Sequence, residues 1–165
     1  MKFDLLPILY DDGRKLPLEI EFDFVGKEED GAKFLTPVKV KGSFVNIGGS
    51  IELGATAVCR LEYSCDRCCE SFEDEFQCSI DEIFKKEDAK DLDSQNPDAI
   101  ILEGTAVELD EIVLGNIIVN LPQKRLCRED CKGLCANCGQ NLNVSACNCD
   151  TRPTDPRFDI LDKLL

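Results

Sequence analysis

Histidine is missing from this sequence of 165 residues. The imidazole ring is the side chain that most often acts as a general base near neutral pH, and it is also a common metal ligand. A G-x-S-x-G sequence is missing too, so the common arrangements of nucleophile and base are not available. We therefore expect a protein that is not an enzyme, in which any transition-metal site consists chiefly of sulfur ligands.

The N-terminus lacks a basic stretch followed by a long apolar run, and it contains Asp4 and Pro7. A secretory signal peptide needs a basic stretch followed by an apolar run, and a membrane-spanning helix needs about 20 apolar residues. We therefore expect a soluble, cytoplasmic protein with no membrane partner. In a reducing compartment, closely spaced thiols are more often metal ligands than disulfides, and the total of eleven cysteines also fits poorly with complete pairing.

Charge is distributed unevenly along the chain. The formal net charge is −14, which argues against binding nucleic acid through the overall field, because phosphate neutralisation requires clustered Lys and Arg. Residues 1–121 carry a net charge of −15, whereas residues 122–165 carry a net charge of +1. The less acidic end is also the end richest in cysteine.

Alternation of apolar and polar residues is the clearest structural pattern, and it is typical of half-buried strands. It runs through residues 51–63 and returns in residues 72–84, with shorter runs at 16–22 and 38–44. Gly48-Gly49 predicts a hairpin turn between the run at 38–44 and the run at 51–63. These runs favour an antiparallel sheet.

The second half of the chain begins with polar residues 85–98, which we interpret as an exposed loop, followed by a short strand at 99–102. Apolar residues at three- and four-residue spacing then predict a core-facing helix near 109–121, ended by Pro122. Near the C-terminus, Asp155 and Pro156 before a second apolar run predict a short terminal helix.

The predicted fold class is α+β, with a predominantly antiparallel β-sheet, one core-facing helix, a cysteine-rich C-terminal segment and a short terminal helix. We divide the chain into a β-rich body at residues 1–122 and a cysteine-rich, zinc-binding tail at residues 123–165 that packs on the body.

Eight of the eleven cysteines occur as closely spaced pairs: Cys65 and Cys68, Cys127 and Cys131, Cys135 and Cys138, and Cys147 and Cys149. Tetrahedral zinc with Zn–S bonds of about 2.3 Å needs sulfurs roughly 3.8 Å apart, and two residues of one tight turn can supply that spacing. Gly139 fits such a turn, since the residue after the second ligand often needs a backbone that only glycine adopts easily. Four such pairs without any histidine predict two zinc ions.

The eight cysteines can be grouped in more than one way. We favour one local site of Cys135, Cys138, Cys147 and Cys149, because closing a short loop costs little chain entropy. The other pairs, Cys65 with Cys68 and Cys127 with Cys131, then form the second site. A rival grouping joins Cys127, Cys131, Cys135 and Cys138, and a single site or no site also remains possible.

Three cysteines fall outside these pairs. Cys59 and Cys78 lie on the apolar faces of their predicted strands, so we interpret both as small core residues. Cys69 adjoins the first C-x-x-C pair, where it could act as a substitute ligand, but we interpret it as a packed or surface thiol. A C-x-x-C pair can also be a redox motif, but here it lies between two predicted strands rather than at the start of a helix.

Seven basic residues lie near the paired cysteines, and they are the candidates for contact with RNA or another partner: Arg67, Lys124, Arg125, Arg128, Lys132, Arg152 and Arg157. Lys and Arg on a loop held by metal could pair with phosphates at low ordering cost. Acidic residues such as Glu129 and Asp130 are interspersed among them, so an ordinary surface of mixed charge is the alternative interpretation.

Several motifs together resemble the YceD family. They are Cys65-Asp66-Arg67-Cys68, Leu121-Pro122, Leu126-Cys127-Arg128-Glu129-Asp130-Cys131-Lys132-Gly133-Leu134-Cys135, Cys138-Gly139-Gln140-Asn141-Leu142-Asn143, Cys147-Asn148-Cys149 and Asp155-Pro156-Arg157. The resemblance extends from about Ile51 onward. It implies a cytoplasmic protein linked to accumulation of large-subunit (23S) ribosomal RNA, with no established catalytic residues.

Three functional hypotheses follow. The first is a non-enzymatic, zinc-binding factor in ribosome biogenesis that binds ribosomal RNA or a large-subunit assembly intermediate. The second is an acidic adaptor that binds a basic partner, such as a ribosomal protein, without direct RNA contact. The third is a thiol redox protein. The first two hypotheses involve no small-molecule substrate. The third requires disulfide cycling in place of bound metal.

Overall fold

The computed structural model describes residues 2–86, 99–102 and 104–149, and within these residues the chain divides into two compact units. The first unit contains the described residues within 2–63 and 73–123, and the second contains residues 64–72 and 124–149. Our predicted boundary after residue 122 lies one residue from the division after Gln123. Residues 64–72, however, which we placed in the body, cluster with the second unit.

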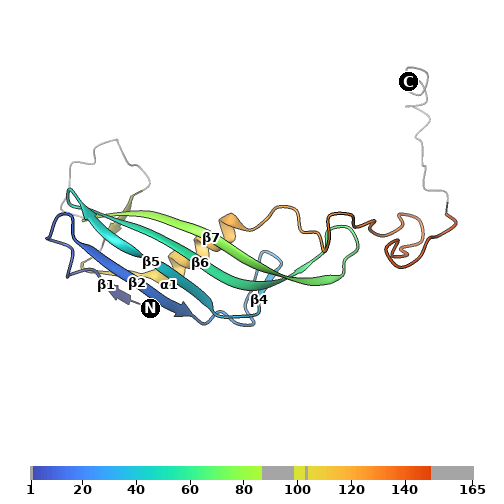
Figure 1. Cartoon of the computed structure of the whole chain (residues 1–165), viewed down its shortest axis with the longest axis horizontal. Helices are drawn as coiled ribbons and strands as arrows, with labels where there is room; N and C mark the ends of the chain where they lie inside the picture. The colour runs from blue at the N-terminus through green and yellow to red at the C-terminus, as the bar shows by residue number, and fades with distance from the viewer. Residues whose placement is uncertain (1, 87–98, 103, 150–165) are drawn as a thin grey trace, which may run out of the picture. The chain divides into compact units, whose positions relative to one another are not determined.

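Four long strands form most of the sheet of the first unit (Figure 1). They are β2 (Lys15–Phe22), β5 (Val38–Ile47), β6 (Ser50–Ser64) and β7 (Ser71–Lys86). Strand β5 pairs antiparallel with both β2 and β6. Strand β7 pairs with the edge of β6 that does not face β5. The four runs of alternating residues thus correspond to the four long strands, which confirms these predictions.

Burial along the strands follows the alternation of the sequence. In β6 the apolar residues from Ile51 to Tyr63 are buried at every second position, and the residues between them are exposed or half-buried. The turn between β5 and β6 contains Gly48 and Gly49 with φ values of +59° and +87°, a backbone that glycine adopts at no steric cost. The predicted hairpin is therefore confirmed.

Short strands complete the first unit, and most of them were not predicted. They are β1 (Lys2–Asp4), β3 (Glu28–Glu29), β4 (Ala32–Phe34), β8 (Ile100–Leu102) and β9 (Ala106–Glu108). Strand β4 pairs with the end of β6, β3 pairs with β4, and β1 and β9 form a separate two-stranded sheet. The predicted strand at 99–102 corresponds to β8, which pairs parallel with β7.

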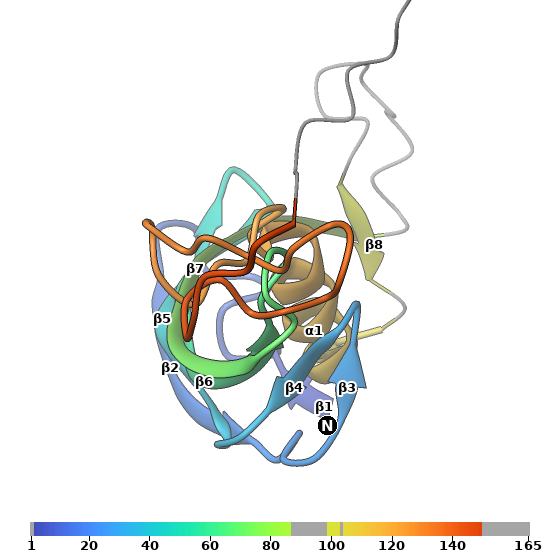
Figure 2. The ribbon, with the colours of Figure 1, turned by 90° about the vertical axis from the view of Figure 1, so that its right-hand side faces the viewer.

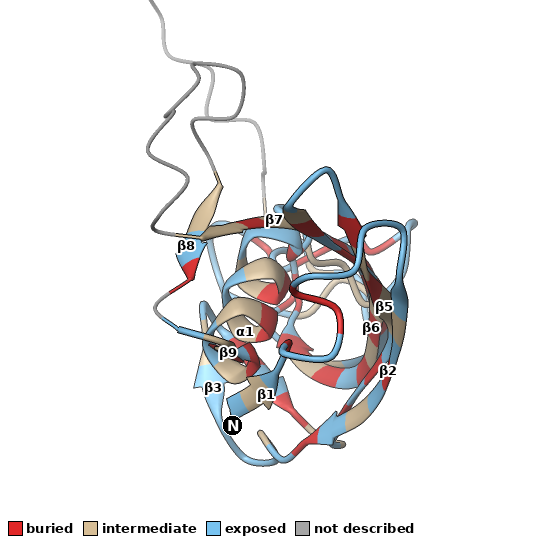
Figure 3. Cartoon of the chain, turned by 90° about the vertical axis from the view of Figure 1, so that its left-hand side faces the viewer, coloured by how far each residue is buried: buried red, intermediate tan, exposed pale blue. Residues whose placement is uncertain are grey.

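Helix α1 (Leu109–Asn120) lies within the curve of the sheet, and buried positions alternate with exposed or half-buried ones along the long strands (Figures 2 and 3). Leu109, Val113 and Ile117 are its buried residues, one helical turn apart, so the core-facing helix is confirmed. The helix ends where Leu121 adopts an extended backbone, with ψ of 140°, as expected for a residue that precedes proline.

The predicted loop at 85–98 is wrong at its first two residues. Lys85 and Lys86 were assigned to an exposed loop, but they continue β7 and are half-buried, because they pair with β8. The rest of that loop, residues 87–98, and the predicted terminal helix lie outside the described residues. Within the described part of the chain, no helix is both long enough and apolar enough to cross a membrane.

Candidate metal centres

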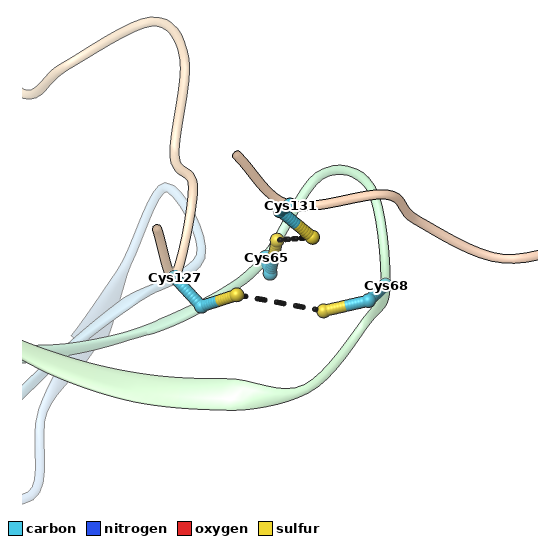
Figure 4. A group of neighbouring side chains, drawn as sticks. All are labelled: Cys65, Cys68, Cys127 and Cys131. Atoms are coloured by element: carbon cyan, nitrogen blue, oxygen red, sulfur yellow. Dashed lines mark hydrogen bonds between the residues drawn. The ribbon is translucent and has the colours of Figure 1, made fainter. Parts of the chain in front are cut away.

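The first group of cysteines, which we call the hairpin site, consists of Cys65, Cys68, Cys127 and Cys131 (Figure 4). The Sγ atoms of Cys65 and Cys131 are 3.8 Å apart, and those of Cys68 and Cys127 are 3.7 Å apart. All four sulfurs lie within 4.8 Å of one another. These separations match the roughly 3.8 Å expected between the ligands of one tetrahedral zinc ion.

A tight turn between β6 and β7 positions Cys65 and Cys68. The Cys65 N–H donates to the Glu70 carbonyl at 2.9 Å, and the Cys69 N–H donates to the Cys65 carbonyl at 2.9 Å. Cys69 has φ of +58°, a left-handed backbone that allows the chain to leave the turn. The turn therefore presents two sulfurs on one side of the hairpin tip.

The second group, which we call the tail site, consists of Cys135, Cys138, Cys147 and Cys149, whose sulfurs also lie within 4.8 Å of one another. Its first pair lies on a turn with the same hydrogen bonds. The Cys135 N–H donates to the Gln140 carbonyl at 2.8 Å, the Gly139 N–H donates to the Cys135 carbonyl at 2.9 Å, and Gly139 has φ of +71°. Both C-x-x-C pairs thus lie on turns with the same pattern of backbone hydrogen bonds.

Backbone N–H groups point toward sulfurs at both sites. The pKa of Cys65 is lowered to about 6, chiefly by the backbone N–H of Cys127 and, against the effect of burial, by those of Cys68 and Arg67. The pKa of Cys135 is also lowered to about 6, by the backbone N–H groups of Cys138 and Asn137. Hydrogen bonds to a thiolate favour the charged form, which is the form that binds metals.

Crowding has the opposite effect elsewhere in the tail site. The pKa of Cys149 is raised to about 12, first by its hydrogen bond with the Cys138 side chain and then by burial. Four sulfurs at this spacing cannot all carry negative charge favourably unless a cation lies among them. Both the geometry and the donor set therefore fit a divalent, thiolate-binding metal.

The two sites differ in exposure. In the hairpin site, Cys65, Cys68 and Cys131 have exposed fractions of 1%, 4% and 2%, and Phe72 and Leu126 pack against them. In the tail site only Cys135 is buried, Cys138 is exposed, and the other two are half-buried. Solvent therefore reaches the tail site more readily.

The arrangement agrees with the grouping that we favoured from loop length, and the rival grouping of the Cys127 pair with the Cys135 pair is not formed. The eight paired cysteines are thus brought together in two sets of four. That they bind a metal stays a prediction.

The remaining cysteines lie where we predicted. Cys59 and Cys78 are buried, and burial raises the pKa of both thiols, to about 11 for Cys59, where the nearby Cys78 adds to the effect. Cys69 is an exposed thiol. These three residues are therefore separate from both sites.

The predicted contact residues differ in what surrounds them. The Arg67 guanidinium donates to the carbonyl of Cys131 at 2.7 Å and to that of Glu129 at 3.5 Å, so it stabilises the hairpin site. Arg128 forms an ion pair with Asp130 at 3.4 Å. Lys124 and Lys132 are exposed, and Arg125 is half-buried. Arg152 and Arg157 lie outside the described residues.

Two asparagines near the sites were missed by the sequence analysis. Asn143 donates from Nδ2 to the Sγ of Cys131 at 3.3 Å, and Asn141 donates from Nδ2 to the Glu70 carboxylate at 2.9 Å. The only available signal was the run Asn141-Leu142-Asn143 inside the motif that resembles the YceD family, and that run gives no indication of which atoms it contacts.

Comparison with known proteins gave one family. The family model described as "Large ribosomal RNA subunit accumulation protein YceD" matches residues 53–165. An uncharacterised protein of Mycobacterium leprae (strain TN) is 24% identical over 110 residues, which cover 66% of this chain and 50% of that protein. The chain thus spans about half the length of this curated relative. No solved structure matches the chain.

Proposed function

The chain belongs to the YceD family of large ribosomal RNA subunit accumulation proteins, and on that basis we propose that it is a non-enzymatic, zinc-binding factor supporting 23S rRNA accumulation. The observation that carries the proposal is the pair of four-cysteine groups inside the region matched by the family model. We place its action in the cytoplasm, on ribosomal RNA or a large-subunit assembly intermediate.

Zinc is the metal that suits these sites best. Sets of four thiolates in tetrahedral spacing favour zinc or iron–sulfur centres over calcium and magnesium. The 3.7 Å and 3.8 Å separations in the hairpin site suit a single ion, since a cluster of several iron atoms would hold its cysteine sulfurs farther apart. Four cysteines also leave no position open for water, which supports a structural rather than a catalytic role.

The role of the metal would be to hold the chain in place. Bound at the hairpin site, it would link residues 64–72 to the segment that begins at residue 124, and the second unit would thereby keep a fixed surface. Lys124 and Lys132 are exposed on this segment and could pair with phosphates. Arg67 donates to backbone carbonyls, so we assign it to support of the site rather than to RNA.

The experiment has a biochemical part and a cellular part. Reduced protein should contain two zinc ions per chain, one of which is lost in Cys65→Ser and the other in Cys135→Ser. Cells that lack the protein should accumulate less 23S rRNA, and the wild type but not Cys65→Ser should restore it. Metal-free, fully folded wild-type protein would refute the zinc proposal, and an unchanged rRNA level would refute the cellular one.

RNA contact is tested separately. Lys124→Glu with Lys132→Glu should weaken binding to a 23S rRNA fragment and flatten the dependence of affinity on salt, because fewer counterions are released. Lys39→Glu with Lys41→Glu, on β5 of the first unit, changes net charge equally and serves as the control. Equal loss in both double variants would indicate a nonspecific effect of charge.

The second candidate function is an adaptor for a basic ribosomal protein, which is favoured by the net charge of −15 in residues 1–121. In that case purified basic large-subunit proteins would bind in a salt-dependent manner, while the rRNA fragment would not. Binding to the rRNA fragment but to none of the basic proteins would exclude this candidate.

A further inference from the structure

The turns of the two sites are in direct backbone contact. The N–H of Leu134, which precedes the tail site, donates to the carbonyl of Arg67, inside the hairpin site, at 3.0 Å. Gly133 has φ of +75°, and a Cβ on it would lie 2.9 Å from that same carbonyl oxygen. Only glycine allows this approach, so the two turns are joined without any intervening side chain.

Asn143 links the two sites through its side chain. It lies between the two cysteine pairs of the tail site, and its Nδ2 donates to the Sγ of Cys131 in the hairpin site at 3.3 Å. Its Oδ1 accepts from the Lys132 N–H at 2.8 Å, which fixes the amide next to Cys131. A donor to a ligating sulfur spreads the negative charge of the thiolate and orients it.

Asn141 holds Asn143 in place. Its Oδ1 accepts from both the backbone N–H and the Nδ2 of Asn143 at 2.9 Å, while its own Nδ2 donates to the Glu70 carboxylate at 2.9 Å. The Glu70 carbonyl in turn accepts from the Cys65 N–H. The loop of the tail site therefore contacts both halves of the hairpin site.

We infer that the two sites bind metal cooperatively, with Asn143 as the positioning residue that couples them. The inference rests on the proposed zinc binding. The loop that carries Asn141 and Asn143 is closed by the cysteine pairs of the tail site, so a metal there removes the entropy cost of ordering both asparagines against the hairpin site. Because coupling between binding sites is reciprocal, metal at the hairpin site strengthens the tail site by the same factor.

The first experiment measures zinc affinity at each site separately. Full-length protein is titrated with zinc against a chelator, and the occupancy of each site is read from protection of its cysteines against alkylation, mapped by mass spectrometry. Cys138→Ser with Cys149→Ser disables the tail site without touching the contacts of the hairpin site. Zinc affinity at the hairpin site should then fall by about 5- to 150-fold, the usual range of coupling.

The second experiment tests Asn143 in a double-mutant cycle. Asn143→Ala should lower zinc affinity at the hairpin site by about 10-fold in the intact protein, as for other partners of metal ligands. In the protein with a disabled tail site, the same substitution should change affinity by about twofold or less, since Asn143 is no longer held there. A general loss of folding would not produce this non-additivity.

One further variant separates loss of the amide donor from loss of packing. Asn143→Asp keeps the shape and the acceptor for Lys132 but lacks the amide donor, so it should reduce affinity at least as much as Asn143→Ala. With cobalt in place of zinc, Asn143→Ala and Asn143→Asp should both shift the sulfur-to-metal charge-transfer bands of the hairpin site. Asn120→Ala, an exposed asparagine of α1 that bonds only within the helix, is the matched control among the described contacts.

Each outcome decides between the alternatives. Two zinc ions in the wild type with unchanged hairpin-site affinity in the disabled-tail protein would show independent sites, which overturns the inference and leaves the proposed function intact. If the losses of zinc affinity in the cycle are additive, Asn143 does not couple the two sites. Wild-type protein that binds no metal would overturn the zinc proposal and the inference together.

Discussion

Cys69 and Gly139 occupy the same position in two turns of the same design, one residue after the second cysteine of each C-x-x-C pair. Each N–H donates to the carbonyl of the first cysteine at 2.9 Å, and both residues have a left-handed backbone, with φ of +58° and +71°. Glycine adopts this conformation at no steric cost, whereas a residue with a Cβ does so at about 1–2 kcal/mol. The hairpin turn is therefore strained at Cys69.

Cys69→Gly should relieve that strain and stabilise the zinc-loaded protein by up to about 1 kcal/mol, part of the gain being offset by the greater freedom of glycine in the unfolded chain. The reciprocal change, Gly139→Ala, should destabilise it by about 1–2 kcal/mol. Denaturant unfolding of both variants measures these effects. Both should retain two zinc ions, and loss of an ion in Cys69→Gly would mean that Cys69 is a ligand.

Gly133→Ala should destabilise the second unit by about 2–3 kcal/mol, because the left-handed backbone cost adds to the displacement of the Arg67 carbonyl. Gly13→Ala is the matched control. Gly13 has the same φ of +75°, but no atom would lie within 4 Å of its Cβ, so only the backbone cost of about 1–2 kcal/mol applies. Urea unfolding in excess zinc compares the two, and equal losses would refute the role of the contact.

A chelator should remove the zinc ions in two phases, with the tail site emptied first. Cys138 is exposed, whereas three cysteines of the hairpin site are almost completely buried. Release of zinc to a coloured chelator, followed over time, should show one rapid and one slow equivalent. Cys138→Ser should abolish the rapid phase and Cys68→Ser the slow one. Loss of the slow phase in Cys138→Ser would reverse the assignment.

Stability should fall with rising pH because of Cys59. Burial raises the pKa of this thiol from 9.0 to about 11, so the folded protein keeps the proton while the unfolded chain loses it. The contribution is therefore complete below about pH 9 and is lost as the pH rises toward 11. Urea unfolding from pH 8 to 11 should show a shallower decline in Cys59→Ala than in the wild type. Identical slopes would contradict this prediction.

The long strands could be predicted from the sequence because each presents several alternating positions to the core, as β6 does from Ile51 to Tyr63. Strands such as β3 and β4, with two and three residues, contain too few positions for a period to be recognised. Lys85 and Lys86 were misassigned because their charge suggested a loop, whereas their pairing partner, β8, is separated from them by residues 87–99.

The candidate sites were predicted to the level of ligand grouping. Loop entropy was sufficient to separate the tail site from the hairpin site, since it depends only on positions along the chain. Asn143 could not be found in the same way. Its amide lies beside Cys131 because the Leu142 N–H donates to the Gly133 carbonyl at 2.9 Å and the Lys132 N–H donates to the Asn143 Oδ1 at 2.8 Å, and these contacts cannot be read from spacing along the chain.

The hairpin site combines cysteines that are far apart in the order of synthesis. Cys68 and Cys127 are separated by 59 residues. At about 5–20 residues per second, the ribosome would add the second of them roughly 3 to 12 seconds after the first. During that interval the nascent chain has only Cys65 and Cys68 of the four ligands, so a metal captured early would have half of its final ligands.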